Sequence, residues 1–124
     1  VADDNATNQM VTRAMLQRAG AKVDVVGDGA QAISMVGRFA YDALLMDVQM
    51  PGMDGPEATR RIRRNEADEG ETRPLHIIGL TADAGAEVGG ECRAAGMDFH
   101  LTKPVSRDDL LAAILRCRAE ATAP

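Results

Sequence analysis

Five residues with the chemistry of a metal and phosphate site each follow a short apolar segment of the sequence. They are Asp3, Asp4, Asp47, Thr81 and Lys103. Three carboxylates held close together repel one another, and a bound cation makes such an arrangement tolerable. Because every side-chain ligand would be an oxygen, a hard divalent ion fits best. Mg²⁺ takes one or two carboxylates and keeps its remaining positions for water and phosphate oxygens.

The same residues suit the transfer of a phosphoryl group to a carboxylate. Aspartate is a known covalent nucleophile for phosphoryl groups, which makes Asp47 the candidate acceptor. Lys103 offers a compact positive charge to a phosphate, and the Thr81 hydroxyl can donate to another oxygen. Metal and lysine would neutralise charge in the transition state. Each residue alone also has a structural interpretation, as a turn residue, a helix cap or a surface lysine, and only their joint occurrence favours chemistry.

Short apolar segments alternate with helix-length segments along the chain. Continuous apolar or β-branched runs, typical of parallel strands buried on both faces, occur in "KVDVV" (22–26), "ALLMD" (43–47) and "LHIIGL" (75–80). Val1-Ala2 and "DFHL" (98–101) are weaker strand candidates. Helical spacing and capping residues predict helices over 7–19, 30–38, 56–64, 84–95 and from 106 to about 118.

This alternation predicts an α/β fold with a five-stranded parallel sheet, doubly wound and flavodoxin-like, with helices on both faces. Ligands of such sheets bind outside the carboxyl ends of the strands, so the five residues are expected at one edge. The 124 residues are long enough for one domain, over 1–124. The chain opens without Met on a very short first strand, so we expect a truncated first strand in a piece of a longer polypeptide.

The composition of the chain excludes several classes of function. Hydrophobic residues make up 45% and charged residues 27%, as in ordinary soluble domains. A net charge of −5 argues against nucleic-acid binding by this domain. The sequence has no apolar run near the ~20 residues of a membrane span and no signal peptide, which predicts a cytoplasmic domain that does not itself bind a membrane. Cys92 and Cys117 lack metal-ligand spacing and are expected to be reduced thiols.

Four motifs resemble the receiver domain of two-component response regulators, most of all the receivers of hybrid sensor histidine kinases. They are "VADDN", "YDALLMDVQMPGMDGPEATRRIR", "GLTADA" and "AGMDFHLTKPV". The resemblance implies that Asp47 takes a phosphoryl group from a phosphohistidine. The implied partners are a histidine kinase, its own or cognate, and a histidine phosphotransfer domain. Such a domain promotes its own phosphorylation and dephosphorylation and is no free-standing turnover enzyme.

The resemblance also assigns roles within the site. It implies that Asp4 and Asp47 bind Mg²⁺ directly, that Asp3 acts through water, and that the backbone carbonyl of Gln49 completes the protein ligands. Thr81 and Lys103 would hold the phosphoryl oxygens, and Thr81 would also act in switching.

Two features depart from the family pattern. An aromatic residue that rotates on phosphorylation commonly precedes the lysine by three positions, where this sequence has His100. A histidine can rotate, and it can also titrate near neutral pH, so we assign His100 as a switch residue, with an exposed histidine of no special role as the alternative. The helix at 84–95 contains Gly85, Gly89 and Gly90, which predicts a short, frayed or mobile helix.

Three alternatives remain open. An interaction module of the same fold that is never phosphorylated would be favoured by the loss of one of the acidic residues, and none is lost. A phosphatase of the haloacid dehalogenase type uses an aspartyl-phosphate, but it needs a carboxylate two residues after the nucleophile, where Gln49 stands. A flavin-binding module would need a phosphate cradle, whereas the first loop, "DDNATNQ", is acidic and has no glycine.

Overall fold

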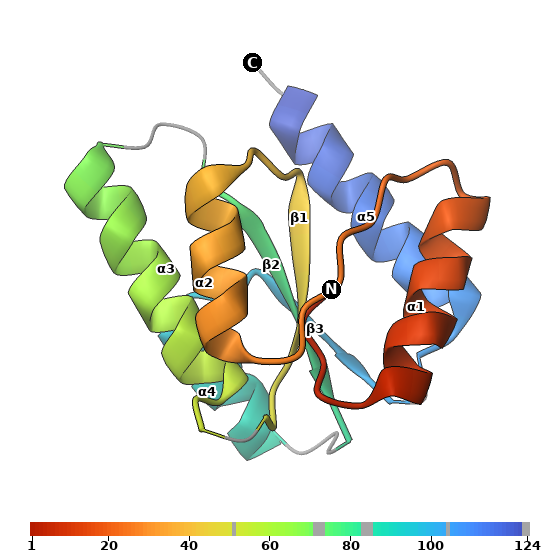
Figure 1. Cartoon of the computed structure of the whole chain (residues 1–124), viewed down its shortest axis with the longest axis horizontal. Helices are drawn as coiled ribbons and strands as arrows, with labels where there is room; N and C mark the ends of the chain where they lie inside the picture. The colour runs from red at the N-terminus through yellow and green to blue at the C-terminus, as the bar shows by residue number, and fades with distance from the viewer. Residues whose placement is uncertain (51, 71–73, 83–85, 104, 123–124) are drawn as a thin grey trace.

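The computed structural model describes residues 1–50, 52–70, 74–82, 86–103 and 105–122. Three parallel strands form its sheet in the order β1-β2-β3 (Figure 1). They are β1 (Ala43–Asp47), β2 (His76–Thr81) and β3 (Phe99–Thr102). The register pairs Asp47 with Leu80 and Thr81 with Thr102, so all three strands end at the same edge.

The predicted count of five strands is wrong within the described residues. The first two candidate segments form isolated parallel bridges instead, in which Ala2 pairs with Val26 on one side and with Met46 on the other. The Ala2 N–H donates to the Leu45 carbonyl at 2.7 Å, and the Asp47 N–H donates to the Ala2 carbonyl at 2.8 Å. One bridge on each side of Ala2 is too short a ladder to count as a regular strand. The segments nevertheless lie in the order 22–26, 1–2, β1, β2, β3, as in a doubly wound flavodoxin-like sheet.

Five helices occur in the described part of the chain. They are α1 (Ala6–Arg18), α2 (Gly29–Arg38), α3 (Gly55–Glu69), α4 (Ala86–Ala95) and α5 (Arg107–Thr122). The prediction for α3 ended it too early, at residue 64. The helix continues to Glu69, and Gly70, with φ of +69°, ends it in the left-handed conformation that glycine adopts freely. Residues 71–73 of the predicted loop, and residues 84 and 85 of the predicted fourth helix, lie outside the described residues.

Side-chain caps fix where several helices begin. Asp28 caps α2, because its carboxylate accepts from the Gln31 N–H at 2.8 Å. Ser106 likewise accepts from the Asp109 N–H at 3.1 Å. Caps of this kind contribute about 1 kcal/mol each. The sequence prediction missed two others, at Asn5 and Asp54.

The helices cover both faces of the sheet, as predicted. In Figure 1, α2, α3 and α4 lie on one side of the strands, and α1 and α5 lie on the other. Alternate residues of each strand face opposite sides. Met46 and Ile77 therefore pack in one cluster with residues of α2, α3 and α4, while Leu45 and Ile78 pack in the other. No helix among the described residues is both long and apolar enough to cross a membrane.

Candidate functional site

Three carboxylates meet at the edge where the strands end. Oxygen atoms of Asp3, Asp4 and Asp47 all lie within 4.8 Å of one another. Asp47 is the last residue of β1, and the bridge between Ala2 and Met46 brings Asp3 beside it. Asp3 is only 1% exposed and Asp47 only 6%, whereas Asp4 is exposed. Two buried acids and a third, exposed one form a strongly negative cluster at the end of the strands, called the acidic pocket below.

Lys103 supplies the positive charge of this pocket. Its Nζ lies 3.0 Å from Asp47 Oδ2 and 3.4 Å from Asp3 Oδ2. The backbone N–H of Lys103 donates to the Thr81 carbonyl at 2.7 Å, which ties the residue to the end of β2. One ammonium against three carboxylates leaves two negative charges uncompensated when all three acids are ionised, and a divalent cation matches that charge.

Burial and charge act in opposite directions on the two central groups. Burial raises the pKa of Asp47, and the nearby charge of Asp3 adds to the rise. The hydrogen bonds and charge of Lys103 and the Gln49 N–H lower that pKa but do not cancel the rise. Burial by itself lowers the pKa of Lys103. The hydrogen bond and charge of Asp47, followed by those of Asp3, outweigh it and raise that pKa overall, so the lysine stays an ammonium.

The remaining predicted residues lie at different distances from this centre. Thr81 is buried at the end of β2, one position beyond the residue that pairs with Asp47. Gln49 is exposed, and its N–H donates to Asp47 Oδ1 at 3.2 Å. His100 is exposed on β3, in register with Gly79, and its ring lies over Gly89 of α4 rather than in the acidic pocket.

Two residues that support the site were not found from the sequence. Gly55 lies so close to β1 that a Cβ on it would be 2.4 Å from the Asp47 carbonyl oxygen. Its N–H donates to the Val48 carbonyl at 2.9 Å, so the start of α3 packs directly on the end of β1. The Gln9 amide donates to the Asp3 carbonyl from the first turns of α1. Neither a glycine at the start of a helix nor a glutamine within one signals such a contact in sequence.

The donor set fits a hard cation such as Mg²⁺. All the clustered ligand atoms are carboxylate oxygens, and within the described part of the chain no cysteine or histidine joins the group. A separate cavity of about 650 Å³ lies away from these acids, and its lining includes Val23, Phe39 and Leu45 but none of the five predicted site residues. The clustered carboxylates, and not this cavity, therefore form the candidate site.

Comparisons with known proteins agree on a family. The family described as "Response regulator receiver domain" matches residues 1–115. Sensor protein GacS of Pseudomonas syringae pv. syringae is 42% identical over 114 residues, which cover 92% of this chain and 12% of that protein. Virulence sensor protein BvgS of Bordetella bronchiseptica is 38% identical over 125 residues, covering 100% of this chain and 10% of that protein. The chain thus spans about a tenth of the length of these relatives.

A solved structure extends the likeness to three dimensions. It is the crystal structure of the receiver domain of sensor histidine kinase PA1611 from Pseudomonas aeruginosa PAO1, with a magnesium ion coordinated in its active site cleft. The two sequences are 41% identical, the TM-score is 0.83, and the match covers 95% of this chain and 93% of that one.

Proposed function

The chain belongs to the response regulator receiver domain family, and we propose that it is a phosphoacceptor domain of a two-component phosphorelay. Asp47 takes the phosphoryl group from a phosphohistidine. One observation carries this proposal: the buried Asp47 carboxylate lies 3.0 Å from the Lys103 ammonium, in a pocket shared with Asp3 and Asp4. A carboxylate so placed is held as a nucleophile and is close to a charge that can receive phosphoryl oxygens.

The chain's own groups divide the work of the transfer. An Asp47 oxygen attacks phosphorus as the bond between phosphorus and the donor imidazole breaks, and the electron pair of that bond stays on the imidazole nitrogen. The Gln49 N–H, bound to Oδ1, helps to orient the carboxylate. Lys103 stays charged and donates to one of the phosphoryl oxygens that acquire negative charge. The Thr81 hydroxyl donates to another of these phosphoryl oxygens.

The residues that would hold Mg²⁺ are Asp4 and Asp47 directly, Asp3 through water, and the backbone carbonyl of Gln49. When bound, the ion supplies positive charge to the phosphoryl oxygens and offsets the repulsion among the carboxylates. The magnesium ion in the PA1611 receiver, whose sequence is 41% identical, supports this part of the proposal.

The donor in this proposal is a histidine kinase, its own or cognate, because related chains include sensor proteins and sensor histidine kinases. The acceptor downstream is a histidine phosphotransfer domain. The domain itself promotes phosphorylation and dephosphorylation of Asp47 without acting as a turnover enzyme on other substrates. We place it in the cytoplasm, where a kinase makes phosphohistidine from ATP. Its net charge of −5 supports partners other than nucleic acid.

Intact-mass measurement tests this function. The protein is incubated with Mg²⁺ and acetyl phosphate, with and without EDTA, alongside Asp47→Asn and Lys103→Met. We expect the wild type to gain the mass of one phosphoryl group, Asp47→Asn to gain none, and Lys103→Met to react roughly 10²-fold more slowly, as when one charge-stabilising donor is lost.

Asp42→Asn serves as the matched control, because it removes an exposed carboxylate just before the same strand. It should react like the wild type. A wild type that gains nothing from acetyl phosphate or from a phosphohistidine protein would contradict the proposal and favour an interaction module that is never phosphorylated.

A further inference from the structure

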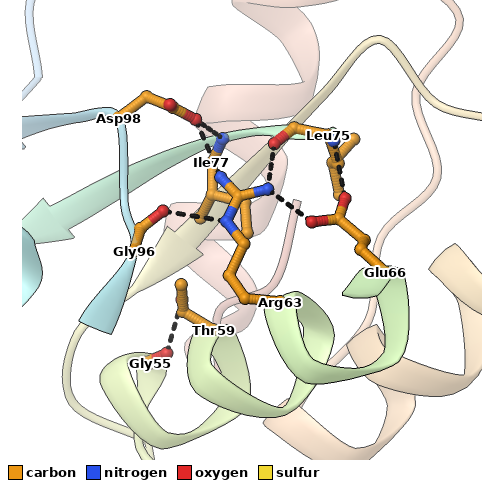
Figure 2. A network of polar contacts seen from close by, with 8 residues as sticks. All are labelled: Gly55, Thr59, Arg63, Glu66, Leu75, Ile77, Gly96 and Asp98. Atoms are coloured by element: carbon orange, nitrogen blue, oxygen red, sulfur yellow. Dashed lines mark hydrogen bonds and ion pairs between the residues drawn. The ribbon is translucent and has the colours of Figure 1, made fainter. Parts of the chain in front are cut away.

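Arg63 of α3 lies at the centre of a polar network at the edge of the sheet opposite the acidic pocket (Figure 2). Its Nε donates to the Gly96 carbonyl at 2.9 Å, and one terminal nitrogen donates to the Leu75 carbonyl at 2.6 Å and to Glu66 at 2.8 Å. The other terminal nitrogen pairs with Asp98 at 3.0 Å. A single planar guanidinium therefore contacts α3, the chain entering β2 and the turn entering β3.

The two carboxylates of the network also hold backbone groups. Glu66 accepts from the Leu75 N–H at 2.7 Å, and Asp98 accepts from the Ile77 N–H at 2.9 Å. The side chain of Arg63 is 22% exposed and that of Glu66 is 17% exposed. Because water reaches Arg63 and Glu66 only in part, the pair between them is less screened than an exposed pair, whereas Asp98, 37% exposed, is screened more.

The network fixes the carboxyl end of α4. Gly96 has a φ of +106°, and a Cβ on it would lie 2.9 Å from Arg63 Cγ. The Gly96 N–H donates to the Arg93 carbonyl and the Met97 N–H donates to the Cys92 carbonyl, both at 3.0 Å, which closes the last turn of the helix. Cys92 and Met97 are buried in the core cluster beside α3. The Arg63 stem therefore packs closely against the hydrogen-bonded turn that ends α4.

The preceding part of the same helix has much weaker support. Gly89 and Gly90 stand next to each other in α4, and glycine is among the poorest helix formers. Apart from its chain neighbours and the helix's own backbone, no atom lies within 4 Å of the Cβ position of the exposed Gly90, whereas Gly89 is buried beneath the ring of the exposed His100. Helix α4 is thus anchored at its carboxyl end and is intrinsically weak at Gly89 and Gly90, the fourth and fifth of its ten residues.

We propose that Arg63 is the anchor of a one-sided hinge: it holds the carboxyl end of α4 and the start of β3 in place, so that α4 bends at Gly89 and Gly90. The anchored end lies where β2 and β3 begin, and the two glycines are nearer the edge where these strands finish. If Asp47 is phosphorylated as proposed, a change at that edge can therefore move part of α4 without releasing β3. The hinge itself exists in the unphosphorylated protein, and its test needs no phosphoryl donor.

Amide hydrogen exchange resolved to single residues tests the hinge in the unphosphorylated protein. In the wild type, the amides of Gly90 and Glu91 should exchange at least about tenfold faster than those of Met97 and Ile77, since one charge-assisted hydrogen bond suffices for that difference. Arg63→Met keeps an apolar stem but removes every donor. It should raise exchange at Ile77, Met97 and Asp98 by about tenfold or more.

Three comparisons make the test decisive. Arg64→Met removes an exposed neighbouring guanidinium and should leave the pattern unchanged, whereas Arg63→Lys, which cannot span the same acceptors, should show an intermediate rise. Amides of β1 report global unfolding, so their change in Arg63→Met sets a baseline that the rise at Ile77, Met97 and Asp98 should exceed. The proposal is overturned if Arg63→Met accelerates β1 amides equally, if it leaves Met97 and Ile77 protected, or if both ends of α4 exchange at one rate in the wild type.

Discussion

Replacing Asp47 by asparagine should stabilise the metal-free protein, although it breaks an ion pair. Two carboxylates lie within 4.8 Å of Asp47, and each repulsion at that distance costs roughly 3.5 kcal/mol at an effective dielectric constant of about 20. The attraction to Lys103 at 3.0 Å contributes about 5.5 kcal/mol on the same basis. Repulsion therefore exceeds attraction by roughly 1.5 kcal/mol, and the burial of Asp47 adds to the cost of its charge.

The direction of the pKa shift leads to the same expectation. Burial raises the pKa of Asp47 in the folded protein, so folding favours the protonated acid. The stability linked to this group is fully present below its unfolded pKa and is lost as pH rises through its folded pKa. At pH 7 the ionised carboxylate therefore lowers the free energy of unfolding. Because Asp4 is exposed and water screens its share, we expect Asp47→Asn to gain about 1–2 kcal/mol in EDTA.

Urea denaturation at pH 7, followed by circular dichroism, measures this gain. Asp42→Asn changes the net charge equally at an exposed position and should leave the midpoint unchanged. Adding Mg²⁺ should stabilise the wild type by mass action and stabilise Asp47→Asn less, because the variant has lost a ligand. A lower free energy of unfolding for Asp47→Asn in EDTA would refute the reasoning, since it would show that the Lys103 pair outweighs the repulsion.

Three further predictions concern other parts of the molecule. Hydrogen bonding to Asp24 raises the pKa of Tyr41, the only tyrosine, to about 12, so absorbance titration should show a tyrosinate midpoint near that value that falls towards 10 in Asp24→Asn. The stability linked to this group is present below pH 10 and is lost as pH rises through the folded pKa. Equal midpoints in both proteins would contradict the assignment. Gly55→Ala should cost about 1–3 kcal/mol in urea denaturation and slow phosphorylation, because its Cβ meets the Asp47 carbonyl; an unchanged midpoint would show that α3 shifts freely. Asp54→Ala removes the cap of α3 and should cost about 1 kcal/mol, with Asp54→Asn close to the wild type as its control.

The sequence was enough to predict the parts of the fold that local pattern determines. The apolar runs at 43–47 and 75–80 correspond to β1 and β2 within one residue. The alternation of apolar segments with helix-length segments predicted helices on both faces of the sheet. From these strands, the rule that ligands bind at carboxyl ends brought Asp3, Asp4, Asp47 and Lys103 to one pocket. That prediction needed only the order of the elements, because parallel strands share an end.

What the sequence missed depends on contacts between distant segments. The segment 22–26 has the composition of a strand, but a strand needs a partner of matching length, and the short first segment supplies one bridge on each side. The prediction that α3 ends at residue 64 was wrong because it took no account of contacts made by Arg63 and Glu66. Their partners lie near the starts of β2 and β3, and these contacts stabilise the last turns of the helix. The close approach of Gly55 to Asp47 is likewise a property of packing and leaves no local signal.

The central claim, that Asp47 is the phosphoacceptor, is tested most directly by locating the phosphoryl group. The phosphorylated protein is reduced with borohydride, which converts an aspartyl phosphate to homoserine, and the peptide spanning residues 39–60 is fragmented in a mass spectrometer. That peptide also contains Asp42 and Asp54, which serve as internal controls. The account predicts homoserine at position 47 and at neither of the other two. Homoserine at position 42 or 54, or at none of the three in a protein that has gained a phosphoryl group, would contradict it.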